Sequence, residues 1–557
     1  MNTTLSSFGG IIPRMSEHSL GPTQATMAHD ALLRDGRLEA WRERAHFADA
    51  VSGARSFHLH GCCVISWPDV VTAAELSPDW TRFYTTGVDG GGLKVVEITR
   101  GCHPTYYAAG VPAPLTPPKA DATCECSREA DARSYVYTYV NRWGEESAPS
   151  PASNIVRVND GTPVTVSGIA TPPDGYGIVA ANIYRATTGF RPADGKIQKP
   201  QTAFLYVTTI EFPSMSFVDT FPAVALGPAI ETQYDRTPPI GMQGVVSIRD
   251  QIRLAGFRRN QVFFSEPFQP HNWPTKYDLT LDYHIRHMGE LDQKLYVTTD
   301  AFPYIIDASS CDENRCSPVV SVETPLPDIG CCYANAAVMT PHGYIYASTM
   351  GIILLGSNGA WHLLTAKWFG EREWQKLRPD TIRMAYWEGF LLFATDMATF
   401  LLNINGDPYG DMESAELVTL SDKPVACLVS NTGKLLLLED DTVWAWDSAD
   451  SLRPYHWRSR PLTGGPDAVG ANRMASATPA RGVAWSPVSC KIGGGPVDMT
   501  LYNARGEAAY TRLIYDETPV RIPRIGRHLW YEVELRGDQP VTFLDLGTAH
   551  FTVNSGR

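Results

Sequence analysis

Short runs of apolar residues, separated by residues that favour turns, recur along most of the chain. Five groups of such runs lie between residues 245 and 446, at 245–264, 295–307, 344–355, 384–402 and 425–446. The runs within each group have the length and composition of antiparallel strands. The groups repeat at a spacing of roughly 45 residues, which is the length of one β-propeller blade.

The segment from residue 262 to residue 307 shows this unit most clearly. An apolar strand at 262–264 runs into a turn that contains Pro267, Pro270 and Pro274, and strands follow at 294–300 and 304–307. Proline fixes φ and cannot donate a ladder hydrogen bond, so the chain must leave the sheet as a rigid turn. Because one such sheet cannot bury both faces, neighbouring sheets must stack and the array must close or be capped.

Between residues 116 and 232 the pattern changes to a set of short strands that spans about 110 residues, the size of a β-sandwich. Tyr135, Tyr137 and Tyr139 alternate and so share one face of a strand. This stretch resembles a fibronectin type III domain in its Tyr-x-Tyr pattern, in Gly-Glu-Glu-Ser and Pro-Ser-Pro at 144–151, and in Ile-Tyr-Arg at 183–185. The resemblance implies a surface module that displays or spaces other parts.

The two ends of the chain complete the predicted fold. Residues 1–55 predict an arm with one hairpin, because Asp35 and Gly36 tolerate the positive φ of a tight turn. The arm is too apolar to be a free tail, so it packs on its own sheet or on a neighbouring subunit. The prediction is a mainly β chain with first sheet or blade strands at 56–115, a fibronectin III-like insertion at 116–232, β-propeller-like blades at 233–461 and a C-terminal β domain at 462–557.

Composition and charge narrow the classes of function. The chain has 43% hydrophobic and 19% charged residues, with 46 Gly and 41 Pro, as expected of a folded, turn-rich β protein. Its formal charge of −13 argues against a surface built to grip nucleic-acid phosphates. No apolar run approaches the roughly 18 residues of a membrane span, and the N-terminus lacks a basic region followed by an apolar one. We therefore expect neither membrane insertion nor secretion by a signal peptide.

The 11 cysteines are an odd number in a long chain and do not predict a disulfide framework. The adjacent pairs Cys62-Cys63 and Cys331-Cys332 are interpreted as buried thiols of a chain that folds in a reducing cytosol.

Two patterns raise the question of a metal. His58, His60 and Cys62 would lie on one face of a strand, and Cys124 and Cys126 form a Cys-x-Cys pair. Neither has a second ligand cluster at matching spacing, so satisfied side chains are favoured and the prediction is no metal and no cofactor.

Catalysis is one alternative. A glycosidase needs two carboxylates, one with a raised pKa, and the acidic residues at 439–441, Glu371 and Glu373 fit solvated turns better. Gly-x-Ser-x-Gly, His-Glu-x-x-His and P-loop patterns are missing, and the turn at 356–361 lacks the aspartate of the sialidase repeat that it faintly resembles. The sequence therefore predicts no enzyme and no catalytic residues.

A second alternative is a module in which exposed aromatic side chains stack on a sugar or a protein. The candidate side chains lie in or beside alternating apolar runs, so they are predicted to belong to blade cores; they are Trp273, Trp387, Trp444 and Trp446.

The order of the parts resembles the tail nozzle, or tail tubular protein B, family of short-tailed bacteriophages. The likeness is carried by Gly-Ile-Ile-Pro-Arg at 10–14, Arg-Asp-Gly-Arg-Leu-Glu-Ala-Trp-Arg at 34–42, Phe-Phe-Ser-Glu-Pro-Phe-Gln-Pro-His-Asn-Trp-Pro at 263–274, Pro-Tyr-Ile-Ile at 303–306 and Trp-Tyr-Glu-Val-Glu-Leu at 530–535. The element at 263–274 is the most specific of these, and residues 462–500 are the least similar.

This resemblance implies a homohexameric tube at the distal end of a phage tail, assembled in the bacterial host cytoplasm. The tube would attach to the adaptor under the portal, carry fibres or a needle, and open on adsorption so that viral DNA passes without specific binding. An acidic chain suits that role, because each phosphate neutralised by Lys or Arg adds affinity and friction. The alternative is a β-propeller tail protein that degrades polysaccharide or binds glycans.

Overall fold

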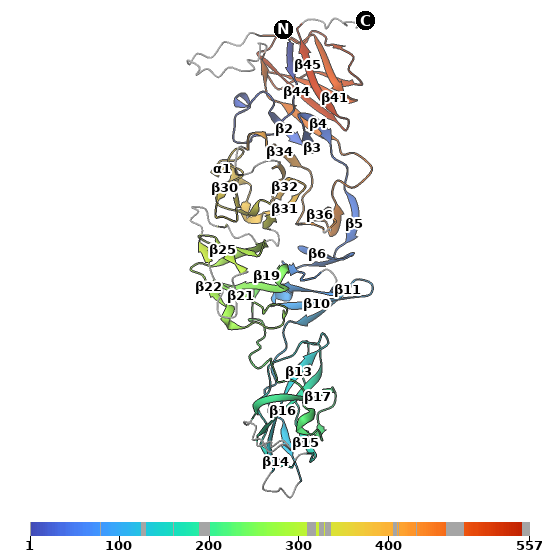
Figure 1. Cartoon of the computed structure of the whole chain (residues 1–557). Helices are drawn as coiled ribbons and strands as arrows, with labels where there is room; N and C mark the ends of the chain where they lie inside the picture. Colours follow the sequence, from blue (N-terminus) through green and yellow to red (C-terminus); the bar gives the residue numbers. More distant parts are fainter. Residues whose placement is uncertain are drawn as a thin grey trace.

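The computed structural model describes residues 2–77, 80–123, 130–159, 161–188, 201–308, 319–321, 328, 336–404, 409, 412–430, 432–463 and 484–548. Three bodies follow one another along the long axis of the molecule: a terminal β domain that contains the first and last described strands, a propeller, and a sandwich (Figure 1). Among the described residues α1 (Glu371–Lys376) is the single α-helix. None of the helices in this part of the chain has the length and apolar character needed to cross a membrane.

In the part of the chain that the structure describes, six antiparallel blades of four strands are arranged around one axis, and in five of them the strands are consecutive. Five blades are separate sheets, and β31–β34 is the beginning of a longer sheet. The first strand of each sheet is innermost, because these strands contact one another in chain order. The first two sheets are β8 (Thr72–Ala74), β9 (Arg82–Thr86), β10 (Lys94–Thr99) and β11 (His103–Ala108), and β19 (Gln243–Ile248), β20 (Arg253–Arg258), β21 (Gln261–Phe264) and β22 (Leu279–Thr280).

The next three sheets have the same order from the axis outward. They are β23 (Ile285–Leu291), β24 (Lys294–Thr299), β25 (Tyr304–Asp307) and β26 (Val319–Ser321); β27 (Ala337–Thr340), β28 (Gly343–Ala347), β29 (Ile352–Leu355) and β30 (Trp361–Leu363); and β31 (Arg383–Trp387), β32 (Phe390–Ala394), β33 (Thr399–Asn403) and β34 (Leu417–Leu420). Short 3₁₀ turns lie at Glu17–Ser19, Val88–Gly90, Ala223–Ala225, Arg249–Gln251, Thr275–Tyr277, Pro379–Thr381 and Met412–Ser414.

The sixth sheet combines the two ends of the propeller. Its inner strands are β35 (Ala426–Val429), β36 (Leu435–Glu439) and β37 (Thr442–Ala445), and its outer strand is β5 (Ala45–Asp49) from the N-terminal region. Strand β5 is antiparallel to β37, with Ala45 opposite Ala445 and Asp49 opposite Thr442. The ring is therefore closed by hydrogen bonds between segments almost 400 residues apart in the chain.

A two-stranded hairpin, β6 (Ser56–His60) and β7 (Cys63–Trp67), fills the remaining sector. On one side Phe57 packs with Leu436 of the sixth sheet. On the other side Ile65 and Trp67 pack with Phe83 of the first sheet. The hairpin thus occupies the place of a seventh blade with half the usual number of strands.

The terminal domain grows out of the fifth blade. Strand β34 pairs in parallel with β2 (Ala25–His29), and the sheet continues through β38 (Tyr455–Ser459), β44 (Trp530–Gly537), β41 (Val497–Asn503) and β42 (Ala508–Ile514), with β39 (Leu462–Thr463) beside β44. The other terminal sheet contains β1 (Asn2–Leu5), β3 (Ala31–Arg34), β4 (Arg37–Ala40), β45 (Val541–Gly547), β40 (Ser489–Gly494) and β43 (Val520–Arg521). One apolar core runs from Leu544 in this domain to Leu392 and Leu437 in the blades.

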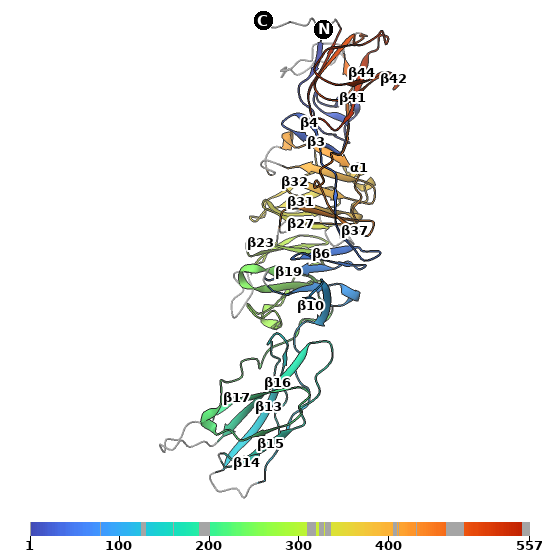
Figure 2. The same cartoon turned by 90° about the vertical axis from the view of Figure 1, so that its right-hand side faces the viewer.

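The inserted sandwich projects from the opposite end of the propeller (Figure 2). One sheet contains β12 (Lys119–Asp121), β15 (Val164–Ser167) and β18 (Phe217–Asp219); the other contains β14 (Val156–Val158), β13 (Asp131–Asn141), β16 (Ile178–Thr188) and β17 (Gln201–Glu211). Tyr135, Tyr137 and Tyr139 share one face of β13, as their alternation predicts, and all three are buried in the sandwich core.

The predicted fold class is confirmed: the chain is mainly β, with a propeller-like body, an inserted sandwich and a C-terminal β domain. The hairpin turn also forms where expected, with Asp35 at φ 51° and Gly36 at φ 77°. The segment 1–55 is no separate arm, however. Its first strands belong to the terminal domain and β5 belongs to the propeller, as does the region 56–115, while the terminal domain already begins at β38, before residue 462.

The shared core predicts a large effect of truncation at one buried position. Leu437 is 0% exposed in that core, so Leu437→Ala should lower the free energy of unfolding by about 2–5 kcal/mol. Chemical denaturation followed by tryptophan fluorescence measures this. The matched change Leu513→Ala, at a side chain 38% exposed, should have an effect below about 1 kcal/mol. Equal effects at the two positions would contradict the assignment of the core.

Candidate functional site

The innermost strands of the seven sectors enclose a channel along the propeller axis. Residues of β6, β8, β19, β23, β27, β31 and β35 line a cavity of about 690 Å³ there. Apolar side chains are prominent in its wall, among them Val245, Met288, Met339 and Met384. A cavity of this volume accommodates a drug-sized molecule. A nucleic-acid duplex therefore cannot pass through a single propeller.

A carboxylate with two histidine partners lies in the channel wall. Glu75 Oε1 accepts hydrogen bonds from His58 Nε2 at 3.0 Å and His60 Nδ1 at 2.8 Å. Burial alone would raise the pKa of the Glu75 carboxyl, but the hydrogen bonds and charges of the two histidines lower it to about 2. Both histidines are thus engaged with this carboxylate, and Cys62 lies apart from them in the turn after β6.

The cysteines of the same hairpin differ from the prediction of buried thiols. Cys62 is exposed, and Cys63 forms a disulfide with Cys102 in the turn between β10 and β11. The spacing of Cys62 and Cys63 in the sequence does not show which distant turn lies beside them. The pairing of Cys63 with Cys102 therefore could not be inferred from spacing. Cys427 and Cys490 are buried thiols, while Cys124, Cys126, Cys331 and Cys332 lie outside the described residues.

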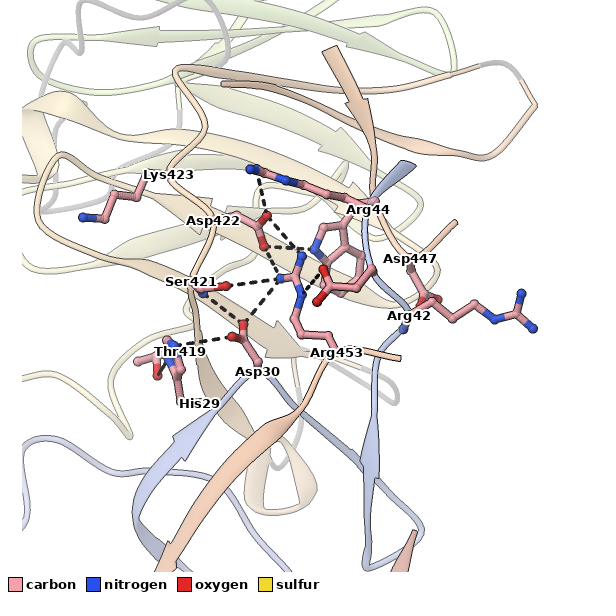
Figure 3. Close-up of polar contacts among 12 residues, drawn as sticks. His29, Asp30, Arg42, Arg44, Thr419, Ser421, Asp422, Lys423, Asp447 and Arg453 are labelled. Carbon is pink, nitrogen blue, oxygen red and sulfur yellow. Dashed lines mark hydrogen bonds and ion pairs between the residues drawn. The ribbon is translucent and has the colours of Figure 1, made fainter. Parts of the chain in front are cut away.

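A cluster of charged side chains lies where the terminal domain meets the propeller (Figure 3). Arg453, just before β38, contacts Asp422 Oδ2 at 2.5 Å and Asp30 Oδ1 at 3.5 Å. Arg44, just before β5, pairs with Asp422 at 3.4 Å and also with Glu439 at the end of β36. We call these five residues the ionic hub.

The ionic hub joins chain segments that are far apart in sequence. Asp30 follows β2, Asp422 follows β34, and Arg453 precedes β38. The guanidinium of Arg453 therefore connects three strands of the sheet that runs from β31 to β42. The side chains of Asp422 and Arg453 are only 2% and 6% exposed, and the indole of Trp446 donates to Asp422 at 3.2 Å. Sequence reasoning missed the hub, because none of its members forms a local motif with another.

The Pro-rich element at 263–274 binds the segment, at residues 235 and 236, that leads from the sandwich back to the propeller. Asn272 Nδ2 donates to Asp235 Oδ1 at 2.8 Å, and the Trp273 amide donates to the Arg236 carbonyl at 2.8 Å. Within the element, the Glu266 amide donates to the Asn272 carbonyl at 2.8 Å, which fixes the turn. The turn therefore serves as a mount for the inserted domain.

A second contact joins the sandwich to the first blade. The guanidinium of Arg82 on β9 lies between the rings of Trp80 and Trp143, at 4.8 and 4.7 Å from their centroids. It also pairs with Glu145 of the sandwich at 2.9 Å, and both side chains are about nine-tenths buried. Such a desolvated cation between two indoles favours one orientation of the two bodies.

This mount contains an acid with a perturbed pKa. Burial, followed by the charges of Glu146 and Glu266, raises the pKa of Asp235 to about 6. Nearby, burial lowers the pKa of His271, whose Nε2 lies 4.0 Å from Asp235. The junction therefore carries one carboxyl that changes charge near neutral pH.

The acidic residues considered for catalysis lie in two places: Glu371 and Glu373 are on the helix α1 and not in a turn, and residues 439–441 are at the end of β36 and in the turn after it. Glu371 is exposed and Glu373 half-buried on α1, while Glu439 belongs to the ionic hub. Asp440 and Asp441 adopt positive φ in the turn between β36 and β37, and Asp441 accepts a hydrogen bond from the Gly53 amide. The turn at 356–361 is closed by a 2.8 Å hydrogen bond from the Gly356 amide to the Ala360 carbonyl.

The four tryptophans divide into two kinds. Trp273 and Trp446 are 3% and 1% exposed, so they are core residues as predicted. Trp387 and Trp444 are half-buried instead. Trp387 donates to the Gly433 carbonyl at 2.8 Å, and Trp444 carries the Arg44 guanidinium 4.5 Å from its ring centroid.

Comparison with known proteins finds propellers of distant sequence. No protein-family model and no curated protein matches the chain. BamB from Moraxella catarrhalis is similar at 10% identity and a TM-score of 0.30, over 81% of this chain and 99% of BamB. Sqt1 from Saccharomyces cerevisiae has 10% identity and a TM-score of 0.26, over 75% and 99% of the two chains.

The extracellular domain of a hybrid two-component system from B. thetaiotaomicron has 10% identity and a TM-score of 0.26, over 60% of this chain. The chain spans 40% of the length of that protein. At these values the likeness carries no argument about function.

Removing the arginine of the ionic hub should destabilise the chain strongly. Arg453→Met leaves the buried Asp422 carboxylate without its closest cation, so the free energy of unfolding should fall by about 3 kcal/mol or more. Arg378→Met is the matched control, since its pair with Asp380 is more than half exposed and should contribute less than about 1 kcal/mol. Denaturant unfolding of the two variants gives the comparison, and similar losses would argue against a buried hub.

The raised pKa of Asp235 predicts how the stability of the folded chain depends on pH. Because the pKa of Asp235 is raised in the folded chain, its ionised form opposes folding, and its contribution to stability falls as pH rises from about 4 to about 6. Asp235→Asn should therefore stabilise the chain above pH 6, by on the order of 1 kcal/mol after allowance for solvent screening, with little effect near pH 4. Unfolding midpoints across this range test it, with exposed Asp538→Asn as the control for loss of one charge. A constant difference at all pH values would exclude this role.

Proposed function

We propose that the chain is the nozzle protein of a short phage tail: a structural subunit that forms, with copies of itself, the distal gated tube through which the genome leaves. The observation that carries the proposal is the role of the element at 263–274. The most specific part of the sequence likeness is also the mount that holds the sandwich on the propeller. In a family whose members share this order of bodies, we expect a sequence element that holds the sandwich on the propeller.

The arrangement of the three bodies supports a wall subunit. The terminal domain and the sandwich lie at opposite ends of the propeller, so each copy can contact different neighbours at its two ends (Figure 1). The continuous sheet from β31 to β42 and the ionic hub join the terminal domain firmly to the blades. In the proposed tube, the terminal domain and the sandwich are the two ends available to the adaptor and to fibres or a needle.

The size of the propeller channel decides where DNA would pass. A cavity of about 690 Å³ excludes a duplex, so the conduit of the proposed tube must lie between copies of the chain. The net charge of −13 suits such a lumen, because phosphates gain few Lys or Arg contacts that would hold the genome back.

A polysaccharide-degrading or glycan-binding propeller remains the competing proposal. Hydrolysis needs a carboxylic acid that is protonated near neutral pH, together with a second carboxylate. The channel carboxylate Glu75 has a pKa of about 2 and stays ionised, so it cannot act as that acid. Asp235 has a suitable pKa but is engaged by Asn272 in the sandwich mount. Neither of these two carboxyls therefore supplies the acid that hydrolysis needs.

The mass and shape of the purified chain test the proposal. Sedimentation velocity and negative-stain images should show a ring of six copies with a central opening wider than a DNA duplex, and labelled antibody should mark the distal tip of phage tails. A polysaccharide release assay on the same preparation tests the competitor. A monomer that releases sugar would replace the nozzle proposal with the enzyme, and a monomer without activity would also overturn the nozzle.

A further inference from the structure

Three cysteine sulfurs meet at the tip of the hairpin in the half-sized seventh sector. Cys62 lies in the turn of the hairpin β6–β7, Cys63 begins β7, and Cys102 lies in the turn between β10 and β11. The three Sγ atoms are all within 4.8 Å of one another. Cys63 and Cys102 are joined as a disulfide, and Cys62 is an exposed free thiol beside it.

The disulfide has a specific task at this position. The other sectors of the ring are sheets of four strands, whereas this one ends at β7. The Cys63–Cys102 bond ties β7 to the neighbouring blade at the hairpin tips, beside the packing of Ile65 and Trp67 on that blade. It therefore fixes a sector that has fewer backbone hydrogen bonds than the others to hold it.

We propose that Cys62, Cys63 and Cys102 form a thiol–disulfide exchange site in which the cross-link alternates between Cys63–Cys102 and Cys62–Cys102. The Cys62 thiolate attacks Cys102 Sγ, the Cys62–Cys102 bond forms as the Cys63–Cys102 bond breaks, and Cys63 leaves as a thiolate that takes up the proton lost from Cys62. One disulfide is present before and after, so the step needs no oxidant or reductant.

Geometry selects the sulfur that is attacked. Attack on Cys63 would join two adjacent residues, whose Cα atoms are about 3.8 Å apart across a trans peptide. Relaxed disulfides need Cα atoms roughly 4.4–6.8 Å apart, and Cys63 and Cys102 lie 5.3 Å apart. Cys102 is also more accessible than Cys63, which is 9% exposed. Exchange therefore leads to Cys62–Cys102.

Both pairings keep the hairpin tied to the first blade, but they present different thiols. With Cys63–Cys102 bonded, the exposed Cys62 is offered at the surface to the thiol or disulfide of another molecule. With Cys62–Cys102 bonded, the free thiol is the buried Cys63. The site thus switches the surface reactivity of the chain without releasing the seventh sector.

Linkage mapping of the full chain tests the exchange. The purified protein is held in mildly alkaline, metal-free, non-reducing buffer, quenched with acid, alkylated under denaturing conditions and digested. Fragment spectra then show which cysteine is linked to Cys102. We expect both the Cys63 and the Cys62 linkages, with the Cys62 linkage increasing over time and alkylated Cys63 increasing by the same fraction. Its absence at every time point overturns the proposal.

Variants separate exchange from mispairing during preparation. Cys62→Ser should retain only the Cys63–Cys102 linkage, and Cys63→Ser, refolded in a glutathione redox buffer, should form Cys62–Cys102. Cys490→Ser, which removes a buried thiol elsewhere, should leave the wild-type time course unchanged. If Cys63→Ser does not fold, the wild-type time course alone decides. A Cys62 linkage that is constant from the first time point indicates fixed mispairing and also overturns the exchange.

Discussion

Pairing of β5 with β37 is the interaction on which the architecture depends. Without β5 the last blade would have only the three strands β35–β37, and Thr442–Ala445 would be its outer edge. Using a strand from the N-terminal region for that edge obliges the chain to bring residues 45–49 beside residues 442–445. The strands on either side, β2–β4 and β38, are consequently held together and can form the terminal domain.

The propeller is joined to the terminal domain and to the sandwich by different kinds of contact. At the terminal domain the connection is a continuous hydrogen-bonded sheet, reinforced by a common apolar core and by the buried Arg453–Asp422 pair. At the sandwich the described contacts are made by turns and side chains, chiefly Arg82 between two indoles and Asn272 on Asp235. The first connection is made by backbone pairing, and the second by a few specific groups, of which Asp235 has a pKa raised to about 6.

Local pattern was enough to identify most strands and some turns. The Tyr face of the sandwich, the hairpin at Asp35 and Gly36, and the strand groups from 245 to 446 follow from side-chain alternation and turn chemistry. Long-range partners did not follow, because the parallel pairing of β2 with β34 and the closure by β5 depend on segments some 400 residues away.

Candidate chemistry was predictable only in part. The sequence predicts ordinary partners for the histidines at 58 and 60, and both hydrogen-bond to Glu75, a residue that their spacing does not identify. The ionic hub and the Cys63–Cys102 bond each join residues from separate turns, which a single sequence does not place together. The prolines predict a rigid turn, but its contacts with residues 235 and 236 join separate segments that a local pattern does not bring together.

The sandwich leaves and rejoins the propeller at nearly one point, where Gly110 lies against Thr237 and Pro238. A side chain at Gly110, which has φ 82°, would collide with the ring of Pro238, so the two segments are in close contact there. Within the propeller, a domain attached in this way takes the place of a loop between the blade strands β11 and β19. Evolution can therefore exchange it for an unrelated module, or lose it, without changing the register of a single blade strand.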